Sequence, residues 1–137
     1  VLDQQLWRPP GGDALSGISA FARMSVSPSD RSTIGFYADG GMVLAGVIPN
    51  RPNDRFGFSF IYTQYAHALR RFDDDARRFG ADPSLRRSFE ANLEVTYLAE
   101  IMPGWDVLPS IVHVWNPSER PGARNALVVG LRTRLLY

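Results

Sequence analysis

The chain has 137 residues, of which 45% are hydrophobic and 12% aromatic, enough for one domain with either a core or a lipid-facing surface. Its 15 basic and 14 acidic residues are spread along the chain and give a formal net charge of +1, so neither a nucleic-acid footprint nor an acidic tail is indicated. The absence of cysteine excludes disulfide frameworks, cysteine-ligated metal sites and thiol nucleophiles.

No segment has the pattern of a membrane helix or a signal peptide. No run approaches the roughly 18 apolar residues that a membrane helix needs, and residues 1–5 lack a basic or apolar leader region. If the protein is exported, we expect its signal to have been removed or to lie outside this chain.

Alternating apolar and polar residues, interrupted by clusters of Pro, Gly, Asn and Asp, predict a β-meander. In chain order, residues 1–7 are expected to be the remnant of a strand. Six further strands are expected at residues 16–26, 33–48, 55–69, 87–102, 105–115 and 125–137. Their length of about a dozen residues exceeds the roughly five to six that are usual in soluble sheets and suits tilted membrane strands.

The connections alternate in length. Residues 49–54 and 102–104 form compact turns, whereas 72–85, which is rich in Asp and Arg, predicts a long charged loop or a short helix. Residues 27–31 and 116–124 fall on the same side as this loop. Outer-membrane barrels have short periplasmic turns and longer outer loops, so we expect the carboxyl terminus on the periplasmic side.

The last predicted strand has two distinct faces. Counting back by twos from the terminal residue gives Tyr137, Leu135, Thr133, Leu131, Val129 and Leu127. The opposite face carries Arg132 and Arg134, and an arginine facing lipid at mid-bilayer would cost about 2–4 kcal/mol. We therefore expect lipid on the first face and water on the second. The alternative is an amphipathic edge strand in a soluble sandwich.

Aromatic residues support the membrane interpretation. Phe56, Phe58, Phe60 and Tyr62 occupy alternate positions, which would make a large exposed patch on a soluble monomer but suits lipid. The tryptophans at the two ends of 105–115 fit the aromatic girdles at the two membrane surfaces.

Several short motifs follow one another along the chain: FAR at 21–23, SPSDR at 27–31, YADGG at 37–41, GVIPNRPNDRFG at 46–57 and NALVVGLR at 125–132. Together they resemble the carboxyl-terminal region of the carbohydrate-selective porins of the OprB family. The resemblance implies an all-β, antiparallel transmembrane β-barrel meander of about 16 strands in the bacterial outer membrane. Residues 1–137 would be the carboxyl-terminal part of this one barrel domain and would supply about its last six strands.

The resemblance also implies passive diffusion of glucose and similar sugars into the periplasm. The implied partners are monosaccharide solutes, outer-membrane lipid and the remaining barrel strands, from the rest of the protein or from other chains. No cofactor and no nucleic acid are implied, and association through barrel walls would give a homo-oligomer. Six strands cannot close a channel alone, since single-chain bacterial barrels have at least about eight.

Sugar passage needs hydrogen-bonding groups and an aromatic surface. The inward-facing charged residues are Arg23, Asp39, Glu94, Glu100, Arg132 and Arg134, and the candidate stacking residues are Phe21 and Tyr37. Arginines and carboxylates from different walls would narrow a pore and set a field across it. We expect Arg23, Glu94 and Arg132 at the constriction. The alternative is that these charges pair across adjacent strands and brace the wall.

The sequence gives little support for a catalytic or metal-binding site. His67 and His113 are expected in different strands without a cluster of acidic ligands, so no metal site is predicted. Glu90 and Glu94 share one strand face, unlike the opposed carboxylates of a glycoside hydrolase, and no catalytic residue is predicted. Two other functions stay open: a soluble β-sandwich that binds carbohydrate, and an outer-membrane channel with another solute specificity.

Overall fold

The computed structural model describes residues 1–80, 87–117 and 124–136. These residues form seven strands and one helix. The strands are β1 (Leu2–Trp7), β2 (Gly17–Val26), β3 (Ile34–Ala45), β4 (Arg55–Tyr65), β5 (Phe89–Met102), β6 (Trp105–Trp115) and β7 (Ala126–Leu135), and α1 (His67–Arg78) lies between β4 and β5. Among the described residues, no helix is both long and apolar enough to cross a membrane.

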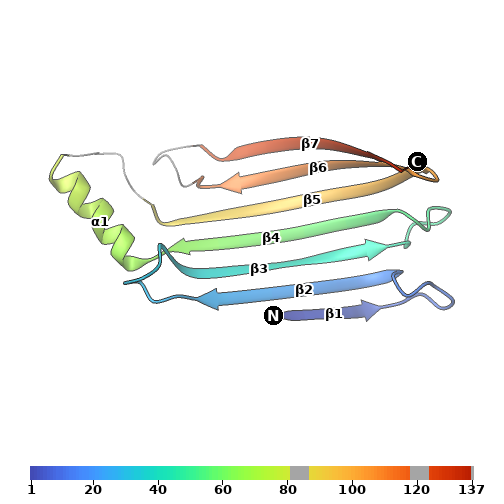
Figure 1. Cartoon of the computed structure of the whole chain (residues 1–137), viewed down its shortest axis with the longest axis horizontal. Helices are drawn as coiled ribbons and strands as arrows, with labels where there is room; N and C mark the ends of the chain where they lie inside the picture. The colour runs from blue at the N-terminus through green and yellow to red at the C-terminus, as the bar shows by residue number, and fades with distance from the viewer. Residues whose placement is uncertain (81–86, 118–123, 137) are drawn as a thin grey trace.

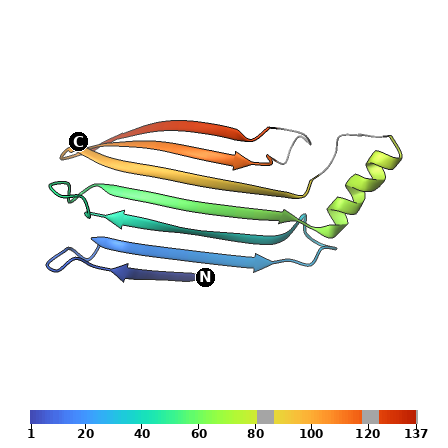
Figure 2. The same cartoon turned by 180° about the vertical axis from the view of Figure 1, so that it is seen from behind.

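The seven strands form one antiparallel sheet in which sequence order and spatial order are the same, β1 to β7. Helix α1 lies beyond the ends of the strands and covers neither face of the sheet (Figures 1 and 2). The β-meander that the alternating pattern predicted is confirmed, and the expected remnant at residues 1–7 is a paired strand.

β3 and β4 end three and four residues earlier than expected. β3 stops at Ala45 because Gly46 adopts a positive φ of 63° and its N–H donates to the Asp54 carbonyl at 2.9 Å, which starts the turn. β4 stops at Tyr65, not at residue 69, because α1 begins at His67. The expected loop or short helix at 72–85 is therefore a helix that starts five residues sooner. Parts of the predicted loops, residues 81–86 and 118–123, and the outward position of Tyr137 lie outside the described residues.

The sheet has almost no interior. Among the described residues, the buried hydrophobic ones are Ala45, Ala66 and Ala91, and the largest fully buried side chain is that of Asp73. By contrast, large apolar residues on β7 such as Val129 and Leu131 are 71% and 76% exposed. Soluble domains bury such residues between two packed layers, so this single layer does not fit the β-sandwich alternative.

Candidate functional site

The strand register assigns the predicted pore-lining residues to one face of the sheet. Residues directly opposite each other on antiparallel strands share a face, and side chains alternate between faces along each strand. Following these pairs from β2 to β7 places the Arg23–Asp39 pair of β2 and β3 on the same face as the Asp106–Arg134 pair of β6 and β7. We call this the polar face; it carries all eight predicted residues, Phe21, Arg23, Tyr37, Asp39, Glu94, Glu100, Arg132 and Arg134.

Arg23, Tyr37 and Asp39 form one cluster on β2 and β3. The Arg23 guanidinium donates from Nε and Nη2 to the two carboxylate oxygens of Asp39, each at 2.9 Å. The guanidinium carbon also lies 5.6 Å from the centre of the Tyr37 ring, within the range of a cation–π contact. This two-pronged pair holds the Arg23 head group close to the wall.

A second ion pair joins β6 and β7. Arg134 donates from Nε to Asp106 Oδ2 at 2.8 Å, and its Nη2 donates to the same oxygen. Asp106 was not among the predicted residues. Its position near the start of the strand that pairs with residues 126–135 could have indicated it as a partner of Arg134. Glu100, also on the polar face, accepts a hydrogen bond from Asn53 Nδ2 at 2.5 Å.

Glu94 and Arg132 differ from these paired residues. Within the described part of the chain, neither side chain makes an ion pair. The three residues expected together at a constriction, Arg23, Glu94 and Arg132, lie on β2, β5 and β7, so the sheet does not bring them onto adjacent strands. They share a face but form no cluster within this segment.

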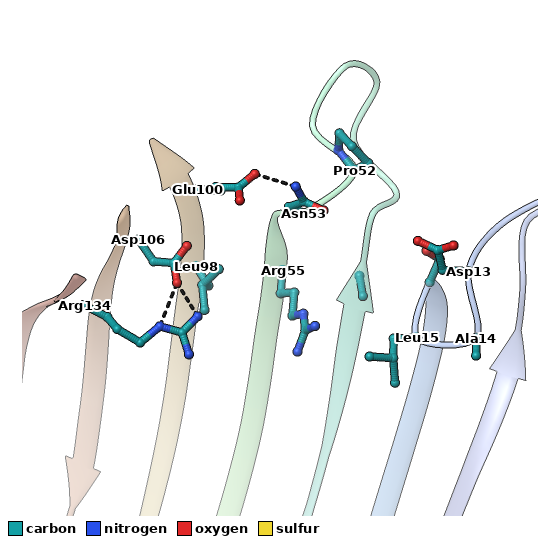
Figure 3. Close-up of a pocket in the computed structure, with 12 residues that line it drawn as sticks. Asp13, Ala14, Leu15, Pro52, Asn53, Arg55, Leu98, Glu100, Asp106 and Arg134 are labelled. Atoms are coloured by element: carbon teal, nitrogen blue, oxygen red, sulfur yellow. Dashed lines mark hydrogen bonds and ion pairs between the residues drawn. The ribbon is translucent and has the colours of Figure 1, made fainter. Parts of the chain in front are cut away.

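A hollow of about 620 Å³ lies on the polar face at the end with the short turns. Its wall includes charges of both signs from several strands and turns, among them Asp13, Arg55, Glu100, Asp106 and Arg134 (Figure 3). Mixed charges around a wide opening suit water and polar solutes.

A family model described as "Carbohydrate-selective porin, OprB family" matches residues 1–136. The chain belongs to the OprB family of carbohydrate-selective porins. Its fold is similar to the high-pH structure of Pseudomonas putida OprB, with a TM-score of 0.86 and 24% sequence identity. The match covers 97% of this chain and 33% of that one, so the chain spans about a third of that porin's length. No curated protein matches the chain.

Membership of this porin family implies the bacterial outer membrane as the location of the chain. The side of the sheet opposite the polar face, which we call the apolar face, fits that environment. Phe56, Phe58 and Phe60 on β4 are 37–42% exposed, and no layer of the described structure covers them. Trp105 and Trp115 are the first and last residues of β6, as predicted.

Asp54 anchors the turn of the OprB-family chain between β3 and β4, beside the large hollow. Asp54 is 3% exposed, and its carboxylate accepts hydrogen bonds from Arg51 Nε at 2.6 Å, from the Glu100 N–H at 3.0 Å and from the Tyr97 hydroxyl. Burial alone would raise the pKa of Asp54, but these hydrogen bonds outweigh it and hold the pKa below its ordinary value. Sequence analysis missed this residue because an aspartate in a polar turn has the pattern of a solvated one.

Among the described residues, neither histidine belongs to a cluster of metal-ligating side chains. His67 is the first residue of α1, so its expected position in a strand was wrong, and its ring contacts Arg70. His113 lies on the apolar face and packs edge-on against Trp115, with ring centres 4.4 Å apart. The described residues contain no group of three or more metal-ligating side chains.

Proposed function

We propose that this chain is the carboxyl-terminal part of an outer-membrane porin barrel through which glucose and similar sugars diffuse passively into the periplasm. The polar face lines the aqueous lumen and the apolar face contacts lipid. The observation that carries the proposal is the separation of the two faces: every predicted pore-lining residue lies on one face, in a member of a carbohydrate-selective porin family.

Closure of the barrel requires further strands beside β1 and β7. Both are edge strands, and unpaired backbone groups in lipid cost several kcal/mol each. We propose that residues 1–137 belong to one barrel domain of about 16 strands, completed by the rest of the polypeptide or by other chains. The short turns face the periplasm, and so does the carboxyl terminus.

Within the lumen, the charges would have two roles. Arg23 and Arg134, held by Asp39 and Asp106, give the wall a fixed pattern of hydrogen-bonding groups at little net charge. Glu94 and Arg132 have no such partner in the described structure and are available to sugar hydroxyls. Diffusion of this kind needs no catalytic residue and no cofactor.

Planar-bilayer conductance of the full-length porin that contains this chain tests the proposal. Glucose should block the current of the wild type, and Arg23→Ala and Arg132→Ala should each weaken that block several-fold because both remove donors from the lumen. Arg31→Ala is the control, since Arg31 lies between β2 and β3 and its side chain is 83% exposed. A porin whose current does not respond to glucose would contradict the proposal.

The second candidate is a channel with another solute specificity. The guanidinium of Arg132, which makes no ion pair with any described residue, favours this candidate, because an unpaired cation in a lumen attracts anions. Strong anion selection in a salt gradient, together with no response to sugars, would support it over the sugar porin.

A further inference from the structure

A row of four residues crosses the polar face from β2 to β5. Phe21 lies opposite Gly41, Gly41 opposite Ser59, and Ser59 opposite Glu94. Three strand spacings separate the two ends of this row, so the Cα atoms of Phe21 and Glu94 are roughly 14 Å apart. Phe21 and Glu94 thus lie at the two ends of this row, with the small residues Gly41 and Ser59 between them.

A hollow of about 190 Å³ lies between them. The Phe21 ring lies over Gly41, since a Cβ placed on that glycine would be 2.8 Å from Cε1 and 3.2 Å from Cζ of the ring. Gly57 and Thr96, which pair with each other one row away, also line the hollow. Gly41 therefore lets the Phe21 ring lie against the wall, and Gly57 leaves the wall low within the hollow.

The lining combines apolar surface with polar groups, as a pyranose requires: Met42, Val43 and Phe58 line the hollow together with Phe21, and Ser59, Glu94 and Thr96 supply the polar groups. A pyranose ring has a face of C–H groups that packs against an aromatic ring and a rim of hydroxyls that needs acceptors and donors. The Glu94 carboxylate makes no ion pair with any described residue and can accept hydrogen bonds from two neighbouring hydroxyls. Ser59 and Thr96 add hydroxyls that both donate and accept.

We propose that this hollow is a binding subsite for one pyranose ring, with Phe21 as the stacking surface and Glu94 as the acceptor of two hydroxyl protons. The inference rests on the proposed function and adds to it a fixed position for the sugar. Because a ring is required for stacking, the subsite distinguishes glucose from sorbitol, an open-chain polyol of nearly the same size and hydroxyl content.

The chain offers a matched pair of glycines for the test. A Cβ on Gly57 would meet Thr96 Oγ1 at 2.5 Å, and a Cβ on Gly130 would meet Ser110 Oγ at 2.7 Å. Both glycines lie on the polar face opposite a hydroxyl residue, but only Gly57 lines this hollow. Gly57→Ala should fill the floor of the subsite, and Gly130→Ala is the control for the same steric change elsewhere.

The experiment is single-channel conductance of the full-length porin with increasing D-glucose or sorbitol. We expect glucose to block the wild type and sorbitol to block it far less. Gly57→Ala, Glu94→Gln and Phe21→Leu should each weaken the glucose block by about tenfold, the effect of losing one strong polar or stacking contact. Gly130→Ala should leave it unchanged, and the open-channel current of each variant reports its folding.

The outcomes separate the subsite from the proposed function. An unchanged glucose block in all three subsite variants would overturn the subsite and leave the sugar porin intact, and so would equal block by sorbitol. A wild type without any response to glucose would overturn both. If Gly57→Ala gives no open channel, Phe21→Leu and Glu94→Gln decide the question.

Discussion

Asp54 is the residue whose environment departs most from what its neighbours in sequence suggest. It belongs to a polar turn, yet its carboxylate is enclosed by Arg51, Tyr97 and the backbone of Glu100. The contacts join the turn between β3 and β4 to β5, the next strand in the sheet. A buried carboxylate with three donors is a strong link, because each donor left unpaired would carry its own desolvation cost.

Replacing Asp54 with asparagine should therefore destabilise the protein. Asn keeps the size but loses the negative charge that Arg51 and the Tyr97 hydroxyl contact, and we expect the free energy of unfolding to fall by about 2 kcal/mol. Urea unfolding of the full-length porin in lipid vesicles measures this change. Asp30→Asn is the control, since the Asp30 side chain is 69% exposed and its pair with Arg31 lies at the surface. Equal midpoints for the two variants would contradict the anchoring role.

Individual residues of the polar face also show what the sequence could and could not predict. Alternation was enough to assign Arg23, Asp39 and Arg134 to one face, since a strand has a period of two. It could not say which charges pair, because pairing depends on the register of two strands, and a slip of one residue exchanges the faces. Arg23 and Arg134 pair across adjacent strands, whereas Glu94 and Arg132 make no ion pair within the described residues. The constriction itself stays a prediction.

At the scale of elements, the least predictable segment was the one that joins β4 to β5. The alternating pattern of β4 runs into Ala66, after which Ala, Leu and Arg favour a helix over a strand. The amino terminus of α1 has no side-chain signal, since no side chain caps it and its first turn contains no acidic residue. What holds the helix is a contact that is distant in sequence, between Asp73 and Arg87, which only the folded chain brings together.

This contact predicts how α1 responds to acid. Burial would raise the pKa of Asp73, but hydrogen bonds from the Arg87 side chain and backbone outweigh it, so the pKa lies below its ordinary value. A lowered carboxyl pKa stabilises the folded state above about pH 4, and this stabilisation is lost as the pH falls through the lowered value. We expect α1 to stay ordered at neutral pH and to loosen only in acid below about pH 4.

A spin label reports this loosening. The chain has no cysteine, so Ala68→Cys on the exposed side of α1 gives one labelling position within it. Asp73→Asn should make the label mobile already at pH 7 and remove its response to acid. Asp75→Asn, a change of the same kind at an exposed position of the same helix, should behave like the wild type. A label that is equally immobile in Asp73→Asn would contradict the anchor.

At the scale of the whole molecule, sequence predicted a β-meander with two unlike faces and strands long enough for a membrane, and the sheet has both. Closure of a barrel could not be derived from this segment, because it depends on the partners of β1 and β7. Alternation within each strand produces the two faces, and the strand register keeps each face on the same side of the sheet in all seven strands. The proposal that one face meets lipid and the other meets water can therefore be tested on a single strand.

Val128 and Val129 are adjacent valines on β7 that face opposite sides of the sheet and are both exposed. Arginine at position 129 would enter lipid near the middle of the strand and cost about 2–4 kcal/mol, whereas arginine at 128 would enter the aqueous lumen. Val129→Arg should strongly reduce the fraction of full-length porin that refolds into phospholipid vesicles, read from its heat-dependent gel mobility. Val128→Arg should refold like the wild type and carry less current, because it narrows the lumen. Since the two variants share composition and net charge, equal refolding yields would mean that the faces are assigned wrongly.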